Sequence, residues 1–134
     1  MRVLHVYKTY YPETQGGLEE VIRQICLNSR SLDIESRVLT LAARPEPRLL
    51  KRPEALVVRA RRNLEVASCG ISAEAFELFG ESLHWSNLVH YHFPWPFADV
   101  LHFALRPEKP TVLTYHSDIV RQRVLGKLYS PLMN

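Results

Sequence analysis

Tyr10-Tyr11-Pro12-Glu13-Thr14-Gln15-Gly16-Gly17-Leu18-Glu19-Glu20 is the stretch that decides the fold of this chain. An apolar run at 3–7 precedes it and predicts a buried strand, and an amphipathic run follows it and predicts a helix. Binding crevices in α/β proteins open at the carboxyl ends of strands, so a glycine pair between a first strand and a helix is a common ligand position. Glycine lets the backbone approach a bound group, and the N–H groups of a helix start favour an anion. Two interpretations of Gly16–Gly17 stay open, a ligand loop and a simple tight turn.

Composition places the chain among ordinary globular domains. Its 134 residues suit one domain with a single hydrophobic core, and 46% apolar and 23% charged residues are usual values. The net charge of +3 is compatible with an anionic ligand or a membrane surface. No aromatic-interleaved basic stripe is present, so no nucleic-acid partner is expected. Arg59, Arg61 and Arg62 form the nearest basic cluster, which we expect to be a solvated loop.

Cysteine usage and hydropathy indicate a cytoplasmic chain. Cys26 and Cys69 lack CxxC spacing, so reduced thiols are expected rather than a disulfide framework or a zinc site. The first apolar run is too short for the hydrophobic segment of a signal peptide. The sequence also contains no apolar stretch long enough to cross a bilayer. We therefore expect neither secretion nor a membrane span.

Strand and helix patterns alternate almost throughout the chain. This order predicts a Rossmann-like three-layer α/β domain, with a mainly parallel twisted sheet and helices on both faces. Leu18, Val21, Ile22 and Ile25 follow helical spacing and are expected to form the buried face of the first helix. Prolines at 45 and 47 predict a break, and residues 63–70 fit either strand or loop. The expected strands are 2–7, 37–41, 56–60, 88–92 and 111–115, and the expected later helices begin near 72, 96 and 120, with Ser72 as a cap.

Histidines occur at the carboxyl ends of the fourth and fifth expected strands. His90 and His92 are two apart on a strand, so both side chains leave one face. They could bind sugar hydroxyls, or hold a metal together with His116. No carboxylate–histidine pattern frames them, and a hydrogen-bonded structural role for His90 is the plainer alternative. In a parallel sheet these strand ends share one edge with Gly16–Gly17, so all three places can converge on one crevice.

His116 leaves an apolar strand and enters a polar turn that contains Asp118. A histidine beside a carboxylate can act as an acid or base, or orient a ligand oxygen. Asp118 can equally cap the next helix, and Arg121 near that helix start can meet a phosphate or stay solvated. No complete Gly-x-Gly-x-x-Gly and no P-loop ending follows the first strand, so neither type of phosphate loop is expected.

Taken in order, these pieces resemble the N-terminal domain of glycosyltransferase family four, which has the two-domain GT-B fold. The resemblance covers nearly the whole chain, and the ordered set is more specific than the glycine pair alone. The run at 115–122 is close to members that build bacterial lipopolysaccharide and capsule sugars, often mannosyltransferases. The matching pieces are Val3-Leu4-His5-Val6, Tyr11-Pro12, Gly16-Gly17-Leu18-Glu19, Val89-His90-Tyr91-His92-Phe93-Pro94 and Val112-Leu113-Thr114-Tyr115-His116-Ser117-Asp118.

The resemblance implies transfer of a sugar from a nucleotide sugar, usually with retention at the anomeric carbon and without a catalytic metal or other cofactor. Gly16 and Gly17 would line the cleft next to the donor diphosphate and the acceptor. His116 matches the histidine near the donor sugar. Asp118 matches an acidic residue often beside it, although Ser117 separates the two here. Substrate contacts are also expected from Tyr11, His92 and Arg121, whereas Asn87 stands where the family usually has an aspartate.

In this family a C-terminal domain with a Glu-x7-Glu motif holds most of the nucleotide. The resemblance therefore implies that 1–134 is a truncated N-terminal, acceptor-side domain with little or no transferase activity of its own. The expected acceptor is a glycan or a lipid-linked intermediate of cell-surface polysaccharide synthesis. Work at the inner membrane face would suit exposed aromatic residues, and core packing explains some of the same residues equally well. The aromatic candidates are Tyr10, Tyr11, Phe93 and Trp95.

Two other functions remain open at this point. One is a Rossmann-type or flavodoxin-like module that binds a nucleotide or a protein without transfer chemistry. The other is a degenerate transferase kept for interaction. A gene that continues for roughly another 200 residues with the Glu-x7-Glu pattern would favour the enzyme, whereas a natural stop codon after Asn134 would favour the module.

Overall fold

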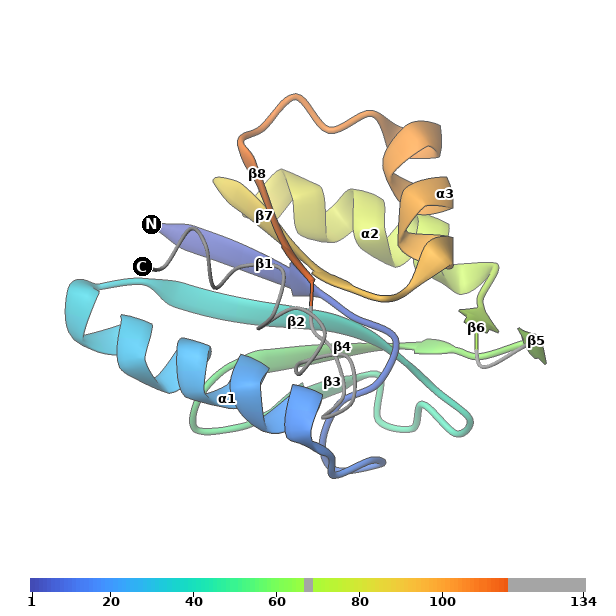
Figure 1. The fold of residues 1–134 in the computed structure, drawn as a ribbon, viewed down its shortest axis with the longest axis horizontal. Coiled ribbons are helices and arrows are strands. Elements are labelled where there is room, and N and C mark those ends of the chain that lie inside the picture. Colours follow the sequence, from blue (N-terminus) through green and yellow to red (C-terminus); the bar gives the residue numbers. More distant parts are fainter. Residues whose placement is uncertain (67–68, 116–134) are drawn as a thin grey trace, which may run out of the picture.

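The computed structural model describes residues 1–66 and 69–115 and is built around a six-stranded sheet (Figure 1). The strand order is β3-β4-β2-β1-β7-β8, and all neighbours pair in parallel except β3 with β4. This confirms the predicted α/β class with a mainly parallel sheet. The strands are β1 (Arg2–Val6), β2 (Glu35–Ala42), β3 (Leu49–Lys51), β4 (Leu56–Arg61), β7 (Leu88–Phe93) and β8 (Thr111–Tyr115).

The helices cover both faces of this sheet, as Figure 1 shows. They are α1 (Gly17–Ser29), continued by the 3₁₀ turn η1 (Arg30–Leu32), α2 (Glu74–Trp85) and α3 (Pro96–Leu105). Phe79 of α2 packs edge-to-face on Tyr91 of β7, whose hydroxyl reaches His102 of α3. Since side chains alternate along a strand, Tyr91 faces α2 and α3, while His90 and His92 face the side of α1.

Several element bounds agree closely with the sequence patterns. The helix at 96–105 and the strand at 111–115 have the predicted limits, and the prolines at 45 and 47 follow the end of β2. Ser72 Oγ accepts a hydrogen bond from the Ala75 N–H at 3.2 Å, two residues before α2 begins. The ambiguous segment contains β5 (Leu64–Val66) paired with β6 (Cys69–Ile71). The helix expected from 120 lies outside the described residues.

The buried face of α1 differs from the prediction. Ile22 and Cys26 are fully buried, but Val21 is 42% exposed and the acidic Glu19 is buried in its place. The apolar spacing was therefore right about the helix and about the burial of Ile22, and wrong about Val21. The reason is that the crossing angle of a helix over a sheet depends on the neighbouring elements, and periodicity alone does not report it.

Two of the three arginines of the basic cluster, Arg59 and Arg61, lie in β4 and not in a solvated loop. Arg59 is only 8% exposed, and its guanidinium donates to the carbonyls of Pro47 and Arg44 at 3.1 and 3.2 Å. Arg61 pairs with Glu46 at 2.6 Å. These hydrogen bonds reduce the free-energy cost of burying the Arg59 guanidinium. They also connect the turn after β2 to β4.

Two of the aromatic residues considered for a membrane surface belong to the core. Tyr10 and Trp95 are 1% and 0% exposed, and the indole N–H of Trp95 donates to the Gly70 carbonyl at 3.0 Å. A membrane-facing role for these two residues is therefore wrong. None of the helices in the described ranges combines the length and the apolar composition needed to span a bilayer. Cys26 and Cys69 are free thiols, as predicted.

Candidate active site

The carboxyl ends of β1, β7 and β8 lie side by side at one edge of the sheet. The two strand pairs are parallel and in register, with His5 beside His90 and His92 beside Thr114. The predicted convergence of these strand ends is therefore confirmed. His116 directly follows β8 in the chain, but His116, Asp118 and Arg121 lie outside the described residues and stay predictions.

The glycine pair marks the start of α1. Gly16 is the residue before the helix and has an extended backbone, with φ −133° and ψ −178°. A Cβ on Gly16 would lie 3.0 Å from Glu19 Oε1, whereas one on Gly17 would meet nothing within 4 Å. A side chain at Gly16 would therefore require the Glu19 carboxylate to shift by a few tenths of an ångström, whereas the space beside Gly17 is open.

The helix start is also a source of donors. The first N–H bond of the helix runs from Glu20 to the Gly16 carbonyl at 3.1 Å, so the helix itself does not use the N–H groups just before Glu20. Those groups and the helix dipole favour an anion. The Glu19 carboxylate lies beside Gly16, and its negative charge would repel a phosphate there. An anion can therefore approach the helix start more easily beside Gly17, where the space is open.

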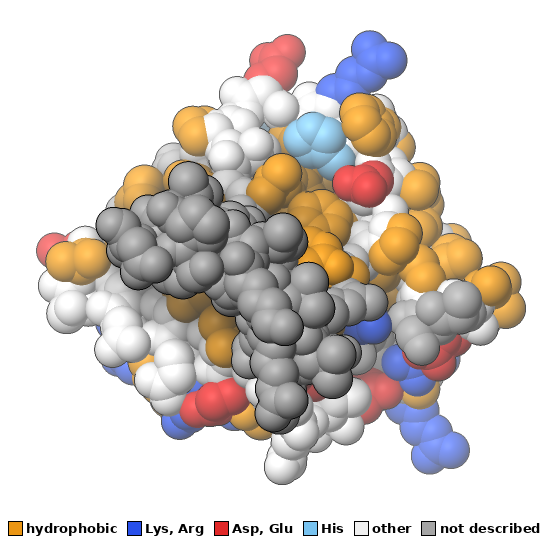
Figure 2. Space-filling view, in the orientation of Figure 1, with side chains coloured by type: hydrophobic (Ala, Val, Ile, Leu, Met, Phe, Trp, Pro, Cys, Tyr) orange, Lys and Arg blue, Asp and Glu red, His pale blue; other side chains and the backbone are white. Residues whose placement is uncertain are grey.

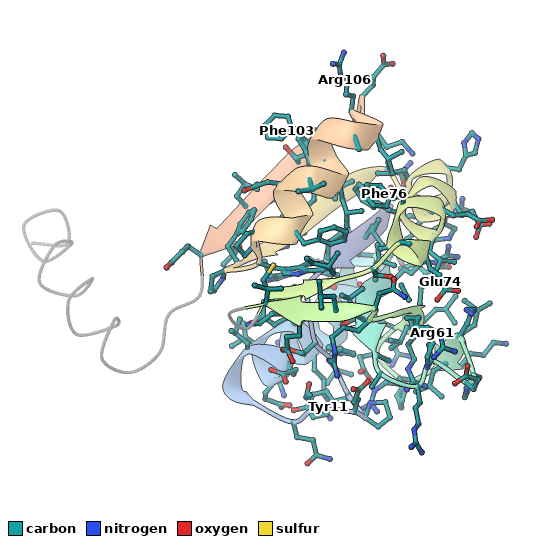
Figure 3. The ribbon with its side chains drawn as sticks, turned by 90° about the vertical axis from the view of Figure 1, so that its right-hand side faces the viewer. Tyr11, Arg61, Glu74, Phe76, Phe103 and Arg106 are labelled. Atoms are coloured by element: carbon teal, nitrogen blue, oxygen red, sulfur yellow. The ribbon has the colours of Figure 1, made fainter. Side chains whose placement is uncertain are left out.

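The Glu20 carboxylate is hydrogen-bonded to three neighbouring side chains. It accepts hydrogen bonds from Tyr11, Arg23 and Gln24 at 2.7, 2.8 and 2.9 Å. The bonds from Gln24 and Tyr11 lower the pKa of Glu20. The hydrogen bond to Glu20 in turn raises the pKa of Tyr11. Tyr11, which lies near the start of α1 (Figure 3), is therefore held in place by Glu20 and by the Arg52 guanidinium 5.0 Å from its ring centre.

The loop between β1 and α1 is anchored at two points that the sequence patterns did not indicate. Tyr10 donates its hydroxyl proton to Glu54 Oε2 at 2.7 Å, and Arg52 Nε donates to the same oxygen at 2.7 Å. Both carboxylate oxygens of Glu13 lie 3.2 Å from the Ala43 N–H. These contacts fix the loop against β2 and the start of β4, and thereby position the glycine pair.

Glu54 makes stability depend on pH. Burial raises the pKa of its carboxyl, but hydrogen bonds from Arg52 and Tyr10 outweigh burial and leave the pKa below its ordinary value of 4.5. A carboxyl with a lower pKa in the folded state stabilises the protein above pH 4.5, and the contribution is lost as pH falls through the folded pKa.

Glu54→Gln is expected to flatten the fall in Tm of the full-length protein between about pH 6 and about pH 3. The control is Glu46→Gln, which removes an exposed ion pair and should keep the wild-type slope of Tm against pH. If Glu54→Gln and wild type had equal slopes of Tm against pH, the role of Glu54 would be contradicted.

A cluster of three histidines lies on the α1 side of the sheet, and sequence reasoning found only two of its members. His5 Nδ1 and His92 Nε2 are 2.9 Å apart and share a hydrogen bond. The rings of His90 and His92 stack with centroids 4.1 Å apart, and His90 Nε2 lies 2.7 Å from Thr114 Oγ1. The shared face of His90 and His92 is confirmed, and so is a hydrogen-bonded position for His90. His5 was missed because only the register of β1 against β7 brings it there.

The histidines are strongly desolvated. His5 and His92 are 1% and 0% exposed, and burial together with the neighbouring His90 lowers the pKa of His5 to about 3. His5 is therefore neutral at physiological pH. Within the described ranges this trio can supply three imidazole nitrogens that lie within 4.8 Å of one another. An ion there would have to displace the His5–His92 hydrogen bond and separate the stacked rings.

The sheet order and the loop at the glycine pair define this chain as a Rossmann-like domain of the GT-B fold. The structure resembles sucrose-phosphate synthase of Thermosynechococcus elongatus with a TM-score of 0.57 and 15% identity, over 96% of this chain and 36% of that one. Residues 15–134 match the family model for Glycosyltransferase Family 4. The chain belongs to glycosyltransferase family 4.

Two curated relatives are similar over essentially the whole chain. D-rhamnosyltransferase WbpZ of Pseudomonas aeruginosa is 52% identical over 134 residues, which is 100% of this chain and 35% of that protein. O-antigen chain mannosyltransferase C of Escherichia coli is 43% identical over 132 residues, which is 98% of this chain and 36% of that protein. The chain thus spans about a third of the length of the curated relatives it matches.

Proposed function

We propose that the full-length protein containing this chain transfers a hexosyl or 6-deoxyhexosyl residue of D-manno configuration from a nucleotide sugar to a glycan or lipid-linked acceptor during cell-surface polysaccharide synthesis. The observation that carries this is 52% identity over all 134 residues to a protein named as a D-rhamnosyltransferase. The second relative is named as a mannosyltransferase, and D-rhamnose is 6-deoxy-D-mannose. The two names therefore agree on the sugar configuration.

In this proposal 1–134 is the acceptor-side domain and a C-terminal domain supplies the donor-binding wall. The open side of Gly17 and the donors at the start of α1 support a place for the leaving diphosphate. Retention at the anomeric carbon follows from the family resemblance alone. His116, Asp118 and Arg121 lie outside the described residues, and the roles proposed for His116 and Asp118 follow from the family resemblance.

The test is transfer by the full-length protein from nucleoside-diphosphate D-rhamnose and nucleoside-diphosphate mannose to lipid-linked and free oligosaccharide acceptors. Mass spectrometry detects the product, and proton NMR of the new linkage reports the anomeric configuration. Binding of a nucleotide sugar without transfer would favour the binding module instead. An inverted product would refute the retaining mechanism and leave the transferase intact.

The chain 1–134 alone is expected to show no transfer above background, because half of the cleft is absent and donor and acceptor are no longer held together. Loss of such positioning removes several kcal/mol of barrier reduction. The full-length protein, assayed at the same concentration, is the control. Circular dichroism establishes that the short chain is folded, and turnover by that folded chain would contradict the expectation.

Transfer is expected to proceed without a metal. Treatment of the full-length protein with EDTA should leave kcat within about twofold of the untreated value, since helix N–H groups and basic side chains neutralise the diphosphate in this proposal. Added Mg²⁺ and Mn²⁺ after EDTA serve as the control. A loss of more than about tenfold that either ion restores would show that a cation carries this charge.

We also propose that the full-length protein is cytoplasmic and works peripherally at the inner membrane face. Hydrophobic side chains gather over α3 in Figure 2, where Val100 and Phe103 are 49% and 73% exposed. An exposed apolar helix face together with a net charge of +3 suits an anionic lipid surface. This surface differs from the buried Tyr10 and Trp95 that sequence reasoning considered.

A further inference from the structure

The histidine cluster connects three neighbouring strands through a continuous series of side-chain contacts. His5 of β1 is hydrogen-bonded to His92 of β7 at 2.9 Å, and His92 stacks on His90 with ring planes 20° apart. His90 then reaches Thr114 of β8 at 2.7 Å. The series therefore crosses the sheet at the strands whose carboxyl ends form the candidate active site.

Core packing alone does not explain why histidines occupy positions 5, 90 and 92. Aliphatic residues are the usual occupants of buried parallel strands, and burying polar rings costs free energy unless each is hydrogen-bonded. His5 is neutral, so its ring has one N–H donor and one acceptor nitrogen. A hydrogen bond between nitrogens of two neutral imidazoles requires one to donate and the other to accept. Since the neutral His5 can either donate or accept at Nδ1, its tautomer and the protonation of His92 Nε2 are coupled across this 2.9 Å contact.

We propose that His5 is a positioning residue, which fixes the tautomer and ring orientation of His92 and, through His90 and Thr114, holds the carboxyl end of β8 at the candidate active site. The inference rests on the proposed transferase function. It adds to that function a set of buried side chains, His5, His92, His90 and Thr114, that supports the strand ends at the candidate active site. Supporting hydrogen bonds hold side chains of an active site in one geometry. This matters because small displacements of groups at the reacting centre lower the reaction rate.

Two substitutions of His5 by residues of similar size distinguish the effect of the His5–His92 hydrogen bond from the effect of packing. Asparagine at position 5 keeps a side chain able to bond His92, and leucine of similar size does not. In the full-length protein His5→Leu is expected to lower kcat at least tenfold with less than a twofold change in the donor KM. His5→Asn is expected to stay within about threefold of wild type. Equal losses in the two variants would overturn the proposal.

The second readout is the ¹⁵N NMR spectrum of histidine-labelled full-length protein, which reports the protonation of each ring nitrogen and needs no activity. Wild type and His5→Asn should show one His92 tautomer, and His5→Leu should show a changed or mixed one. Thr114→Val, which keeps the side-chain shape, should shift only the His90 signals. Unchanged His92 signals in His5→Leu would overturn the positioning role. Absence of transfer by wild type would refute the proposed function, and the spectra would still decide the His5–His92 bond.

Discussion

Replacing His116 with alanine in the full-length protein is expected to lower kcat by about 10² to 10³-fold, the effect of removing one well-placed donor from a site where negative charge develops. His116 directly follows β8, and β8 lies beside β7, which in turn lies beside β1, the strand that leads into the loop of the glycine pair. In the proposed function its imidazole donates to the donor sugar or to the departing diphosphate. The effect should therefore appear in kcat more than in the acceptor KM.

His84→Ala is the matched control for this experiment. His84 lies on an exposed part of α2, on the opposite side of the sheet from the histidine cluster. The same substitution there should leave kcat within about twofold. Circular dichroism and Tm of both variants exclude misfolding. If His116→Ala turned over at the wild-type rate, the assignment of the donor-side histidine would be wrong.

Replacing Trp95 with alanine is expected to lower the free energy of unfolding by about 3 to 5 kcal/mol, the usual range for a large aromatic removed from a core. Trp95 is fully buried, lies 5.8 Å from Phe97 between ring centroids, and bonds the Gly70 carbonyl. It joins the start of α3 to β6. The substitution leaves a cavity and removes the indole N–H that donates to the Gly70 carbonyl.

Two further variants separate the contributions of Trp95. Trp95→Phe keeps most of the ring and removes the N–H, so a loss of about 1 to 2 kcal/mol is expected. Phe103→Ala on the outer side of α3 (Figure 3), where the ring is 73% exposed, should change stability by less than about 0.5 kcal/mol. Urea denaturation monitored by hydrogen exchange of the β6 and α3 amides measures the N-terminal domain within the full-length protein. Similar losses for Trp95→Ala and Phe103→Ala would contradict the assigned core position.

Sequence reasoning located most of the elements that position the candidate site. Proline before an apolar helical run predicted α3 at its observed limits, and alternation of strand and helix predicted the parallel sheet. Period-two spacing placed His90 and His92 on one face. The short antiparallel β3 was not predicted, because three residues at a sheet edge carry too little pattern to be distinguished from a loop.

The sequence by itself determined the α/β class, the glycine pair at the start of α1 and the family resemblance, because these depend on local periodicity and on ordered motifs. Only the tertiary structure decided that His5 meets His92, which lies 87 residues away, and that Arg59 is buried. It also decided that Glu19 turns inward while Val21 faces out. Such outcomes depend on strand register and helix crossing, which are set by packing between distant segments and leave no mark on the local pattern.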